Sequence, residues 1–190
     1  MAGGVRLVAG ERLAPYADGI RAVYADAFGA PPWREDPALA ETYLARLAED
    51  TRRPGFLAAL AFDEGTIVGF ATAWTTPAPF PTGRCYPEAA AALGAERTGS
   101  WLCGAQEVDE LAVHTRVRGS GLGAALLGAL TAETANGRSW LLTSARAGGA
   151  LGFYRRLRWR QATHPAPGGR GVAVFLGPRH PADVPAALPD

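Results

Sequence analysis

Hydrophobic positions near the start of the chain follow a strand pattern and then a helix pattern. The apolar run Val5–Val8 predicts a short first strand. Between Leu13 and Phe28, apolar side chains then recur three or four positions apart, which predicts an amphipathic helix; they include Ile20, Val23 and Tyr24. Gly29 and Pro31-Pro32 are expected to end this helix, because neither residue type continues one easily.

A second helix is expected after the two prolines. Asp36 supplies a side-chain oxygen suited to an N-cap. Pro37 fits the first helical position, since its missing N–H would have no partner there. The helical pattern continues to about Glu49 and stops before Arg52-Arg53-Pro54-Gly55.

From residue 56 onward the hydrophobic period shortens to that of β-strands. The runs 56–62 and 66–75 flank Asp63-Glu64-Gly65, which is typical of a hairpin turn. A connection rich in Pro, Gly and Ala follows at 76–104, with one short helix expected near 87–94. A connection of this length in a compact domain is usually functional or mobile.

The remaining pattern alternates strands and helices. We expect a strand at 106–114, a helix from Gly121 to about Thr134, a strand at 138–144, a helix at 147–157 and closing strands at 159–162 and 171–176. The order β-α-α-β-β-β-α-β-α-β-β predicts an α+β fold with helices on both faces of one mixed sheet. A single domain is expected over 1–177, followed by a Pro-rich tail at 178–190.

Charge and composition narrow the classes of function. The net charge of +1 gives no indication of nucleic acid or an anionic membrane as a partner. Apolar runs stay short of the roughly 18 residues of a membrane span, and no signal-peptide pattern is seen, so a cytoplasmic protein is expected. All 19 basic residues are arginine. This excludes a lysine Schiff base and a Walker-type phosphate site.

Cysteine and histidine usage gives no indication of a metal site. Cys85 and Cys103 lack CxxC spacing, and the chain has only three histidines, so zinc is not expected. Two buried free thiols are the expected state, with a disulfide as the alternative.

A glycine-rich turn between a predicted strand and a predicted helix carries the strongest chemical signal. It reads Arg118-Gly119-Ser120-Gly121-Leu122-Gly123. Glycine reaches positive φ and lets a ligand approach the backbone closely. The N–H groups at a helix start together carry about half a positive charge. A diphosphate is the ligand that suits such a turn.

Other interpretations of this turn must be weighed. A Walker loop needs Gly-Lys-Ser/Thr, which a chain without lysine lacks. A dinucleotide-binding turn has GxGxxG spacing after an early strand, with an acidic residue ending the next strand. Here the spacing is GxGxG, the turn comes late, and the next strand ends Leu142-Thr143-Ser144. A plain tight turn and a different nucleotide-binding module remain as alternatives.

At this point the sequence resembles the Gcn5-related N-acetyltransferase (GNAT) superfamily. The family signature is Arg/Gln-x-x-Gly-x-Gly/Ala after a strand ending Leu-x-Val. It is matched by Leu111-Ala-Val113 and Arg118-x-x-Gly121-x-Gly123. A second family element, Asn-x-x-Ala-x-x-Leu/Phe-Tyr-x-x-x-Gly-Phe, corresponds to 147–159. Ala147 replaces the frequent Asn there, and Arg158-Trp159 replaces Gly-Phe.

The resemblance implies acetyl-coenzyme A (acetyl-CoA) as cofactor and a set of contacts to it. Backbone N–H groups of the turn would hold the diphosphate. The pantetheine arm would pair with the strand end at Val113, like an added strand in a splayed, mostly antiparallel sheet. The cofactor-binding residues implied are Leu111, Ala112, Val113, Arg118, Gly119, Ser120, Gly121, Leu122, Gly123 and Ala124. Family members often dimerise, so a homodimer rests on analogy alone.

Acetyl transfer to an amine needs a base and gains from an acid. The amine must attack in its neutral form, and the departing thiolate gains from a proton donor. Alternation along the strand places Glu107 and Asp109 on one face and Glu110 on the other, unless a bulge intervenes. We predict Glu107 and Asp109 as catalytic carboxylates, with Glu110 as a third candidate. Tyr154 matches the family tyrosine near the sulfur and is the predicted acid; its alternative role is an aromatic core residue.

The acceptor is the part that the sequence defines least. Aromatic residues in the two first helices and in the 76–104 connection, together with the carboxylates, suit a cationic or amphipathic small amine; they are Phe28, Trp33, Trp74, Phe80, Tyr86 and Trp101. The predicted function is therefore transfer of an acetyl group from acetyl-CoA to a primary amine of a small molecule. The alternatives are a protein N-terminal or lysine acetyltransferase and a non-catalytic acyl-CoA sensor.

Overall fold

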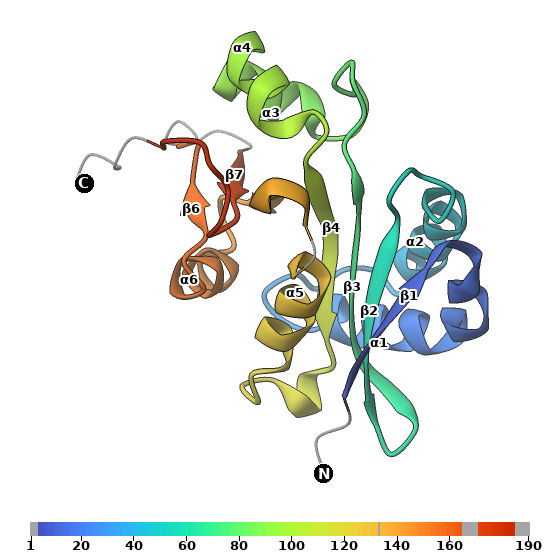
Figure 1. Cartoon of the computed structure of the whole chain (residues 1–190). Helices are drawn as coiled ribbons and strands as arrows, with labels where there is room; N and C mark the ends of the chain where they lie inside the picture. Colours follow the sequence, from blue (N-terminus) through green and yellow to red (C-terminus); the bar gives the residue numbers. More distant parts are fainter. Residues whose placement is uncertain (1–3, 133, 165–170, 185–190) are drawn as a thin grey trace. The chain divides into compact units, whose positions relative to one another are not determined.

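A computed structural model describes residues 4–132, 134–164 and 171–184 (Figure 1). Contacts along the chain group the described residues into two compact units. The first comprises residues up to Trp74 together with Val108–Ala132, and the second comprises Thr75–Glu107 and the residues after 133. The strand β4 (Gln106–Val113) contributes residues to both units.

The first unit contains the predicted strand, the two early helices, the hairpin and the helix after the glycine-rich turn. In order they are β1 (Val5–Ala9), the 3₁₀ segment η1 (Gly10–Tyr16), α1 (Ala17–Gly29), α2 (Ala38–Asp50), β2 (Leu57–Asp63), β3 (Thr66–Thr75), the 3₁₀ turn η3 (Thr115–Val117) and α5 (Leu122–Thr131). The strand order is β1-β2-β3-β4, with β1–β2 and β2–β3 antiparallel. The start of the first predicted helix, up to Tyr16, is 3₁₀ rather than α.

Two local sequence signals act as predicted. The Asp36 carboxylate accepts the Ala38 N–H at 2.8 Å, which satisfies a free donor at the start of α2. Glu64 and Gly65 connect β2 to β3 with φ of 47° and 81°. Positive φ at both central residues is the requirement of a two-residue hairpin turn whose twist matches the strands.

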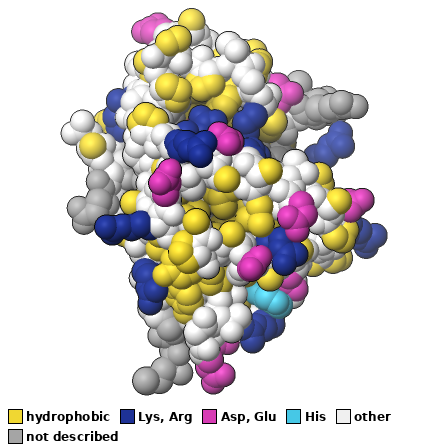
Figure 2. Space-filling model, turned by 90° about the vertical axis from the view of Figure 1, so that its right-hand side faces the viewer, with side chains coloured by type: hydrophobic (Ala, Val, Ile, Leu, Met, Phe, Trp, Pro, Cys, Tyr) yellow, Lys and Arg dark blue, Asp and Glu magenta, His cyan; other side chains and the backbone are white. Residues whose placement is uncertain are grey.

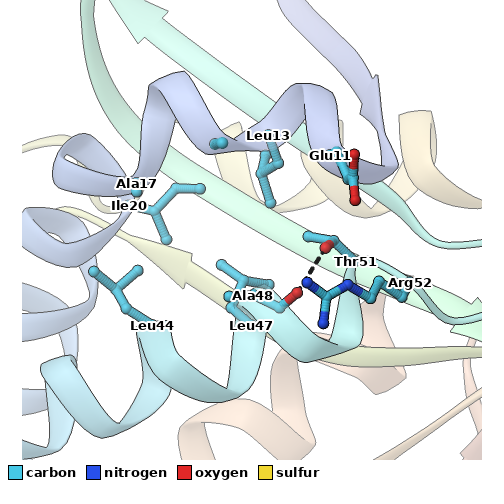
Figure 3. Close-up of a pocket in the computed structure, with 10 residues that line it drawn as sticks. Glu11, Leu13, Ala17, Ile20, Leu44, Leu47, Ala48, Thr51 and Arg52 are labelled. Carbon is cyan, nitrogen blue, oxygen red and sulfur yellow. Dashed lines mark hydrogen bonds between the residues drawn. The ribbon is translucent and has the colours of Figure 1, made fainter.

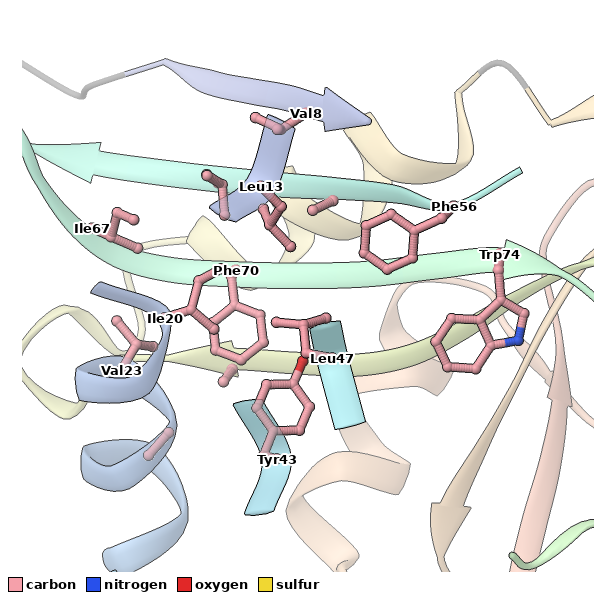
Figure 4. Packing of buried hydrophobic residues seen from close by; sticks show 14 residues of the cluster. Val8, Leu13, Ile20, Val23, Tyr43, Leu47, Phe56, Ile67, Phe70 and Trp74 are labelled. Carbon is pink, nitrogen blue, oxygen red and sulfur yellow. The ribbon is translucent and has the colours of Figure 1, made fainter. Parts of the chain in front are cut away.

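One face of the first unit's strands carries large side chains against α1 and α2. Leu60 pairs with Phe70 across β2 and β3, so both point to this face. Both belong to one buried cluster with Ile20 and Val23 of α1 and with Tyr43 and Leu47 of α2. Figure 4 shows this cluster and labels Phe70 with the four helix residues. The Tyr43 and Phe70 rings lie 5.7 Å apart between centroids. Burying each such side chain contributes roughly 1.5–3 kcal/mol to stability.

The opposite face is lined by small residues and is covered by α5. Ala59 pairs with Ala71, and Ala61 pairs with Gly69, so four positions without bulk share this face. A Cβ added at Gly69 would lie 3.0 Å from Leu126 Cδ1 and 3.3 Å from the Ala112 carbonyl oxygen. The missing side chain therefore lets α5 approach β3 closely.

The second unit contains the remaining strands and the helices of the long connection. They are α3 (Tyr86–Leu93), α4 (Ala95–Arg97), the π-helical turn η2 (Thr98–Leu102), the 3₁₀ turn η4 (Ala135–Gly137), β5 (Ser139–Ser144), α6 (Gly148–Arg156), β6 (Arg160–Gln161) and β7 (Val172–Leu176). The strand order is β4-β5-β7-β6, with β5–β7 and β6–β7 antiparallel. The short helix predicted near 87–94 is confirmed, and η2 extends the helical part of this connection.

Helices cover both faces of the second unit's strands as well. On one face, Val174 and Leu176 pack in a core with Tyr86 of α3 and Trp140. On the other, the Tyr154 ring of α6 lies 5.7 Å from Phe175 between centroids. The predicted α+β class, with helices on both faces and antiparallel pairing, is thus confirmed within each unit. The splay of the sheet and the domain limit at 177 stay predictions.

The described part of the tail is attached to the second unit. Arg160 donates hydrogen bonds to the carbonyl oxygens of His180 and Ala182, the latter at 2.7 Å. The His180 ring lies 3.0 Å from the Trp101 carbonyl oxygen, and burial lowers the pKa of His180. Residues 178–184 are therefore ordered by specific contacts, and 185–190 lie outside the described residues.

The packing of α5 predicts opposite effects for two alanine substitutions. Gly69→Ala should lower the free energy of unfolding by about 1–3 kcal/mol, because its methyl group meets a backbone oxygen and a packed leucine. Gly128→Ala, on an open position inside α5, should raise it by up to about 1 kcal/mol. Urea denaturation of both variants measures the difference. Equal values for the two would contradict close packing at Gly69.

The end of α6 predicts a gain in stability. Arg158, which replaces the family glycine, has a φ of 63°, and the following Trp159 N–H bonds back to the Tyr154 carbonyl oxygen at 3.0 Å. A side chain in this left-handed region is strained, so Arg158→Gly should raise the free energy of unfolding by about 0.5–1 kcal/mol. Arg158→Ala keeps the strained Cβ and should give no gain. Thermal unfolding of the wild type and both variants measures the difference.

Candidate active site

The glycine-rich turn lies exposed in front of α5. Gly119 and Gly121 have φ of 80° and 84°, the left-handed conformation that favours glycine. A Cβ at either position would meet no atom within 4 Å, so the conformation rather than space requires glycine here. The two glycines therefore shape the turn, as predicted, because each adopts a backbone conformation that other residues rarely take.

Backbone donors of the turn divide into used and available groups. The Arg118 N–H bonds to the Thr115 carbonyl oxygen at 3.2 Å, and the Ser120 N–H makes a long 3.4 Å bond to Val117. The Ala125 N–H bonds to the Gly121 carbonyl oxygen at 3.1 Å. The N–H groups of Leu122, Gly123 and Ala124 precede it in the first turn of α5, where no carbonyl of the helix itself can accept them. These donors are the part of the turn predicted to bind an anion, and a diphosphate would suit them.

The last turn of α1 holds the segment that leads into the glycine-rich turn. The Asp26 carboxylate accepts the Thr115 N–H at 2.6 Å and the Thr115 hydroxyl at 3.0 Å. The Arg118 guanidinium donates to the Ala27 carbonyl oxygen at 2.9 Å. Sequence analysis missed Asp26, because it lies 89 positions before Thr115 and no local pattern links them.

The end of β4 joins the turn to the core of the first unit. Ala112 is buried in the cluster with α1 and α2, while Leu111 and Val113 are partly buried. The His114 N–H, just beyond the strand, bonds to the Val68 carbonyl oxygen at 2.9 Å. The pairing of Val113 with a pantetheine arm stays a prediction.

The three β4 carboxylates lie in different surroundings. Glu107, in the second unit, is buried and accepts the Tyr86 hydroxyl at 2.8 and 3.0 Å through its two oxygens. Asp109, in the first unit, has a buried side chain 3.3 Å from the Arg46 guanidinium of α2. Arg46 also lies 3.7 Å from Asp50 and over the Tyr43 ring.

Glu110 is a carboxyl group with strongly altered acidity. Burial, followed by the negative charge of Asp109, raises the pKa of Glu110 to about 8, against the lowering effect of Arg46. Glu35 adds a smaller raising effect. The charges of both Asp109 and Glu110 raise the pKa of Tyr43, and Arg46 interacts with both carboxyl groups. The two carboxyl groups are therefore electrostatically coupled, although strand alternation places them on opposite faces of β4. A carboxyl that titrates near neutral pH is suited to accept a proton from an amine.

Aromatic rings extend from this carboxylate group along α1 and the segment after it. The Tyr24 ring stacks on Tyr43 at 4.5 Å and lies 4.5 Å from Phe28, which in turn contacts the exposed Trp33. The Tyr24 hydroxyl donates to Glu35 at 3.1 Å. Burial and the charge of Glu110 raise the pKa of Tyr24, so its hydroxyl remains a donor at neutral pH. Phe28 and Trp33 were predicted on the acceptor side; Tyr24, Glu35 and Arg46 were missed.

Tyr154, the predicted acid, lies in α6 of the second unit. Its ring packs against Phe153, Trp159 and Phe175 at centroid distances of 5.2, 6.1 and 5.7 Å. The residue is partly exposed. At the start of the same helix, Ala147 is buried and provides no side-chain cap, in line with the departure from the family Asn. The acid role of Tyr154 stays a prediction.

Two pockets in the described residues are lined by other parts of the chain. One of about 470 Å³ lies between η1, α1 and α2 (Figure 3), with Leu13, Ile20 and Leu47 as apolar walls and Glu11 and Arg52 at one end. The other, of about 540 Å³, is formed by residues 78–82 and the helical segments after them, with Cys103 at its wall. None of the predicted catalytic or cofactor-binding residues lines either pocket.

The remaining surface and composition predictions can be compared with the structure. Figure 2 shows arginine and acidic side chains interspersed on the face drawn, so that face has no field of one sign. Both cysteines are free thiols, as predicted, but neither is buried: Cys85 is exposed and Cys103 is partly exposed. Among the described residues, no helix has the length and apolar character to cross a bilayer, and no cluster of His, Cys, Asp or Glu has the form of a metal site.

The raised pKa of Glu110 predicts a pH-dependent stability. Between the ordinary carboxyl value of 4.5 and about 8, the folded protein holds a proton that the unfolded chain has lost. The free energy of unfolding should therefore fall as pH rises through this range, by at most about 1.4 kcal/mol per pH unit. In Glu110→Gln this contribution is absent, so the variant should become more stable relative to the wild type as the pH rises from 5 to 8.

Urea denaturation at several pH values from 5 to 8 measures this difference. Glu49→Gln is the matched control, because the Glu49 side chain on α2 is 75% exposed. A wild-type curve that stays parallel to that of Glu110→Gln over the whole range would contradict the raised pKa.

Comparisons with known proteins cover most of the chain. The sequence model of the acetyltransferase (GNAT) family matches residues 19–158. Among curated proteins there is no significant match. The fold is similar to a GNAT-family acetyltransferase from Desulfovibrio desulfuricans, at 18% identity, with 91% of this chain and 96% of that chain covered and a TM-score of 0.60.

Two further solved structures share the fold. The ribosomal-protein-S18-alanine N-acetyltransferase from Escherichia coli is 17% identical, with 94% of this chain and 96% of that chain covered and a TM-score of 0.56. The PaiA N-acetyltransferase from Thermoplasma acidophilum, solved in complex with coenzyme A, is 11% identical, with 92% and 98% covered and a TM-score of 0.53. Together with the family match over most of the sequence, the turn and the fold lead to one conclusion: this chain belongs to the GNAT family of acetyltransferases.

Proposed function

We propose that the protein transfers the acetyl group of acetyl-CoA to a primary amine of a small molecule. The observation that carries the donor half of this proposal is the exposed start of α5. There, two left-handed glycines and the free N–H groups of the first helical turn form an anion site in a chain of the GNAT family. The diphosphate of acetyl-CoA is the anion that this family would place there.

Glu110 is the base in this proposal. Among the β4 carboxyl groups, Asp109 is paired with Arg46 and Glu107 is hydrogen-bonded to Tyr86. Glu110 has a raised pKa of about 8. This value lies closer to the pKa of an amine than the pKa of an ordinary carboxyl group does. A base with a pKa near the working pH combines a useful fraction of the charged form with a useful proton affinity.

The proposed reaction is a direct transfer without an acyl-enzyme. The amine nitrogen attacks the thioester carbonyl carbon and forms the C–N bond, and the Glu110 carboxylate accepts the proton that the nitrogen loses. The C–S bond breaks, and the sulfur takes a proton from the Tyr154 hydroxyl, which later regains one from solvent. The products are an amide and free coenzyme A. The roles of Glu110 and Tyr154 are proposals on their chemistry, supported for Tyr154 by its family position.

A cationic amine suits the side chains near Glu110. Glu35 and the rings of Tyr24, Phe28 and Trp33 provide a carboxylate and π-faces, both of which attract ammonium groups. An amine drawn in this way would release one proton to solvent before attack, so that the Glu110 carboxylate can accept the proton that the nitrogen loses when the C–N bond forms. The similar Escherichia coli enzyme is named for a protein alanine N-terminus, so a peptide beginning with alanine belongs in the same acceptor screen.

The proposal predicts a pH profile that depends on Glu110. In the wild-type protein, kcat/KM for the amine should rise with pH up to about 8, because the carboxylate form of Glu110 is the active one. Glu110→Gln should lower kcat by about 10²–10⁴-fold and remove that limb. Thiol release from acetyl-CoA, measured from pH 6 to 9.5 with the best amine of a broad library, gives both quantities.

Two controls separate the base from its neighbours. Glu49→Gln changes an exposed carboxyl of α2 and should leave the profile unchanged. Asp109→Asn removes the charge that raises the pKa of Glu110 and should move the limb to lower pH. An unchanged limb in Glu110→Gln would reject Glu110 as base, whereas binding of acetyl-CoA without turnover of any amine or peptide would favour a non-catalytic acyl-CoA sensor.

A further inference from the structure

The segment before the glycine-rich turn is attached to α1 at two points. At its start, both oxygens of Asp26 are used by one residue, Thr115, which donates its N–H at 2.6 Å and its hydroxyl at 3.0 Å. At its end, Arg118 donates to the Ala27 carbonyl oxygen at 2.9 Å. Consecutive residues of one helix thus fix both ends of a four-residue stretch. Charge-assisted bonds of this kind are about twice as strong as neutral ones.

The chemistry of α1 explains why the attachment lies at its last turn. This helix ends at Gly29, so the carbonyl groups of its final residues lack helical partners. The guanidinium of Arg118 satisfies one of them and is favoured by the negative end of the helix dipole. The side chain of Arg118 is therefore directed to the protein, although its position in the family motif suggests a role toward the ligand.

The attachment matters because the residues that follow are intrinsically flexible. Gly119 and Gly121 have the widest backbone freedom of any residue type, and no atom lies within 4 Å of where a Cβ would be at either one. Holding such a turn in one shape costs conformational entropy. This cost weakens ligand binding unless the turn is already ordered in the free protein. The Asp26 and Arg118 contacts order part of the turn before the ligand binds.

We propose that Asp26 is a positioning residue that holds the 115–118 segment against α1 and thereby keeps the backbone amides of the turn in the arrangement that binds coenzyme A. This inference rests on the proposed function for the identity of the ligand. It concerns a residue of α1 that has no counterpart in the family signatures described above. Asp26 acts through Thr115 and touches no reacting atom.

The negative charge of Asp26, considered alone, leads to the opposite expectation for coenzyme A binding. The Asp26 carboxylate of α1 contacts the segment that leads to the anion site, so its charge alone would oppose a diphosphate. Removal of that charge would then tighten binding. If Asp26 instead positions the turn, its removal weakens binding despite the loss of a repulsive charge.

His114 is the other titratable group beside Asp26. Its Nδ1 lies 3.3 Å from the Asp26 carboxylate and 3.3 Å from the Arg116 N–H. This nitrogen can donate to the first or accept from the second, but it cannot do both at once. Because Asp26→Ala removes one of these two partners, all variants are compared with the wild type at one fixed pH.

The test compares Asp26→Ala and Asp26→Asn with the wild-type protein. Calorimetric titration with coenzyme A should show at least about ten-fold weaker binding for Asp26→Ala, since two bonds to a charged acceptor are lost. Asp26→Asn keeps one acceptor oxygen without the charge and should fall between the two. In steady-state kinetics Asp26→Ala should raise KM for acetyl-CoA, while kcat and KM for the amine stay close to wild type.

Asp18→Ala is the matched control. Asp18 is on the same helix, its side chain is 97% exposed, and the substitution removes the same charge. This variant should bind coenzyme A like the wild type. Binding by Asp26→Ala that equals or exceeds that of the wild type would overturn the inference.

Amide hydrogen exchange provides a reading that does not depend on the ligand. In the protein without coenzyme A, Asp26→Ala should increase the exchange of amides 115–121, and Asp18→Ala should not. Unchanged exchange in Asp26→Ala would overturn the positioning role even if the variant were folded and active. Failure of the wild-type protein to bind coenzyme A, with faster exchange in Asp26→Ala, would instead reject the proposed function and leave the positioning role supported.

Discussion

The close approach of α5 to β3 is the contact on which the candidate donor site depends. Gly69 leaves room for Leu126 and for Leu122, the first residue of α5. The helix is therefore fixed at its beginning as well as along its length. Because the free amides belong to that first turn, their position relative to the strands of the first unit follows from a missing side chain on β3. From the other side, Asp26 and Ala27 of α1 hold the segment that enters the turn.

A second feature of the first unit is the concentration of charge around a few buried carboxyl groups. Asp109 and Asp50 share Arg46, and Asp50 also pairs with Arg53, whose guanidinium lies over the Trp74 ring. Buried ion pairs seldom add much to stability, because desolvation offsets their attraction. Their clearer effect here is on acidity: burial together with the charge of Asp109 raises the pKa of Glu110. An arrangement of this kind is expected where a carboxyl must exchange a proton near neutral pH.

The sequence predicted the parts of this structure that depend on local pattern. The hairpin turn at Glu64-Gly65, the cap at Asp36 and the left-handed glycines of the turn each have a short-range physical reason. The contacts that define the candidate site are different in kind. Asp26 reaches Thr115, and Arg46 reaches Asp109, across 89 and 63 positions. No periodicity encodes such pairs, since they arise only when α1 and α2 pack on β4. The choice among the three carboxylates could not be made from alternation, because burial and neighbouring charge rather than strand face set them apart. The end of α6 shows a further limit, since Arg158 adopts the conformation for which a glycine was expected.

The Arg46 ion pair has a consequence for a protein that handles an acylating reagent. Lysine in the same place would offer a primary amine near the proposed base Glu110, and acetylation would remove its positive charge. The guanidinium of arginine is a poor nucleophile and stays protonated at every physiological pH. A chain whose basic side chains are all arginine thus has none that is readily consumed as an acceptor. The positive charge of Arg46 near Glu110 would therefore not be lost by acetylation. Repeated turnover would leave the charges around Glu110 unchanged.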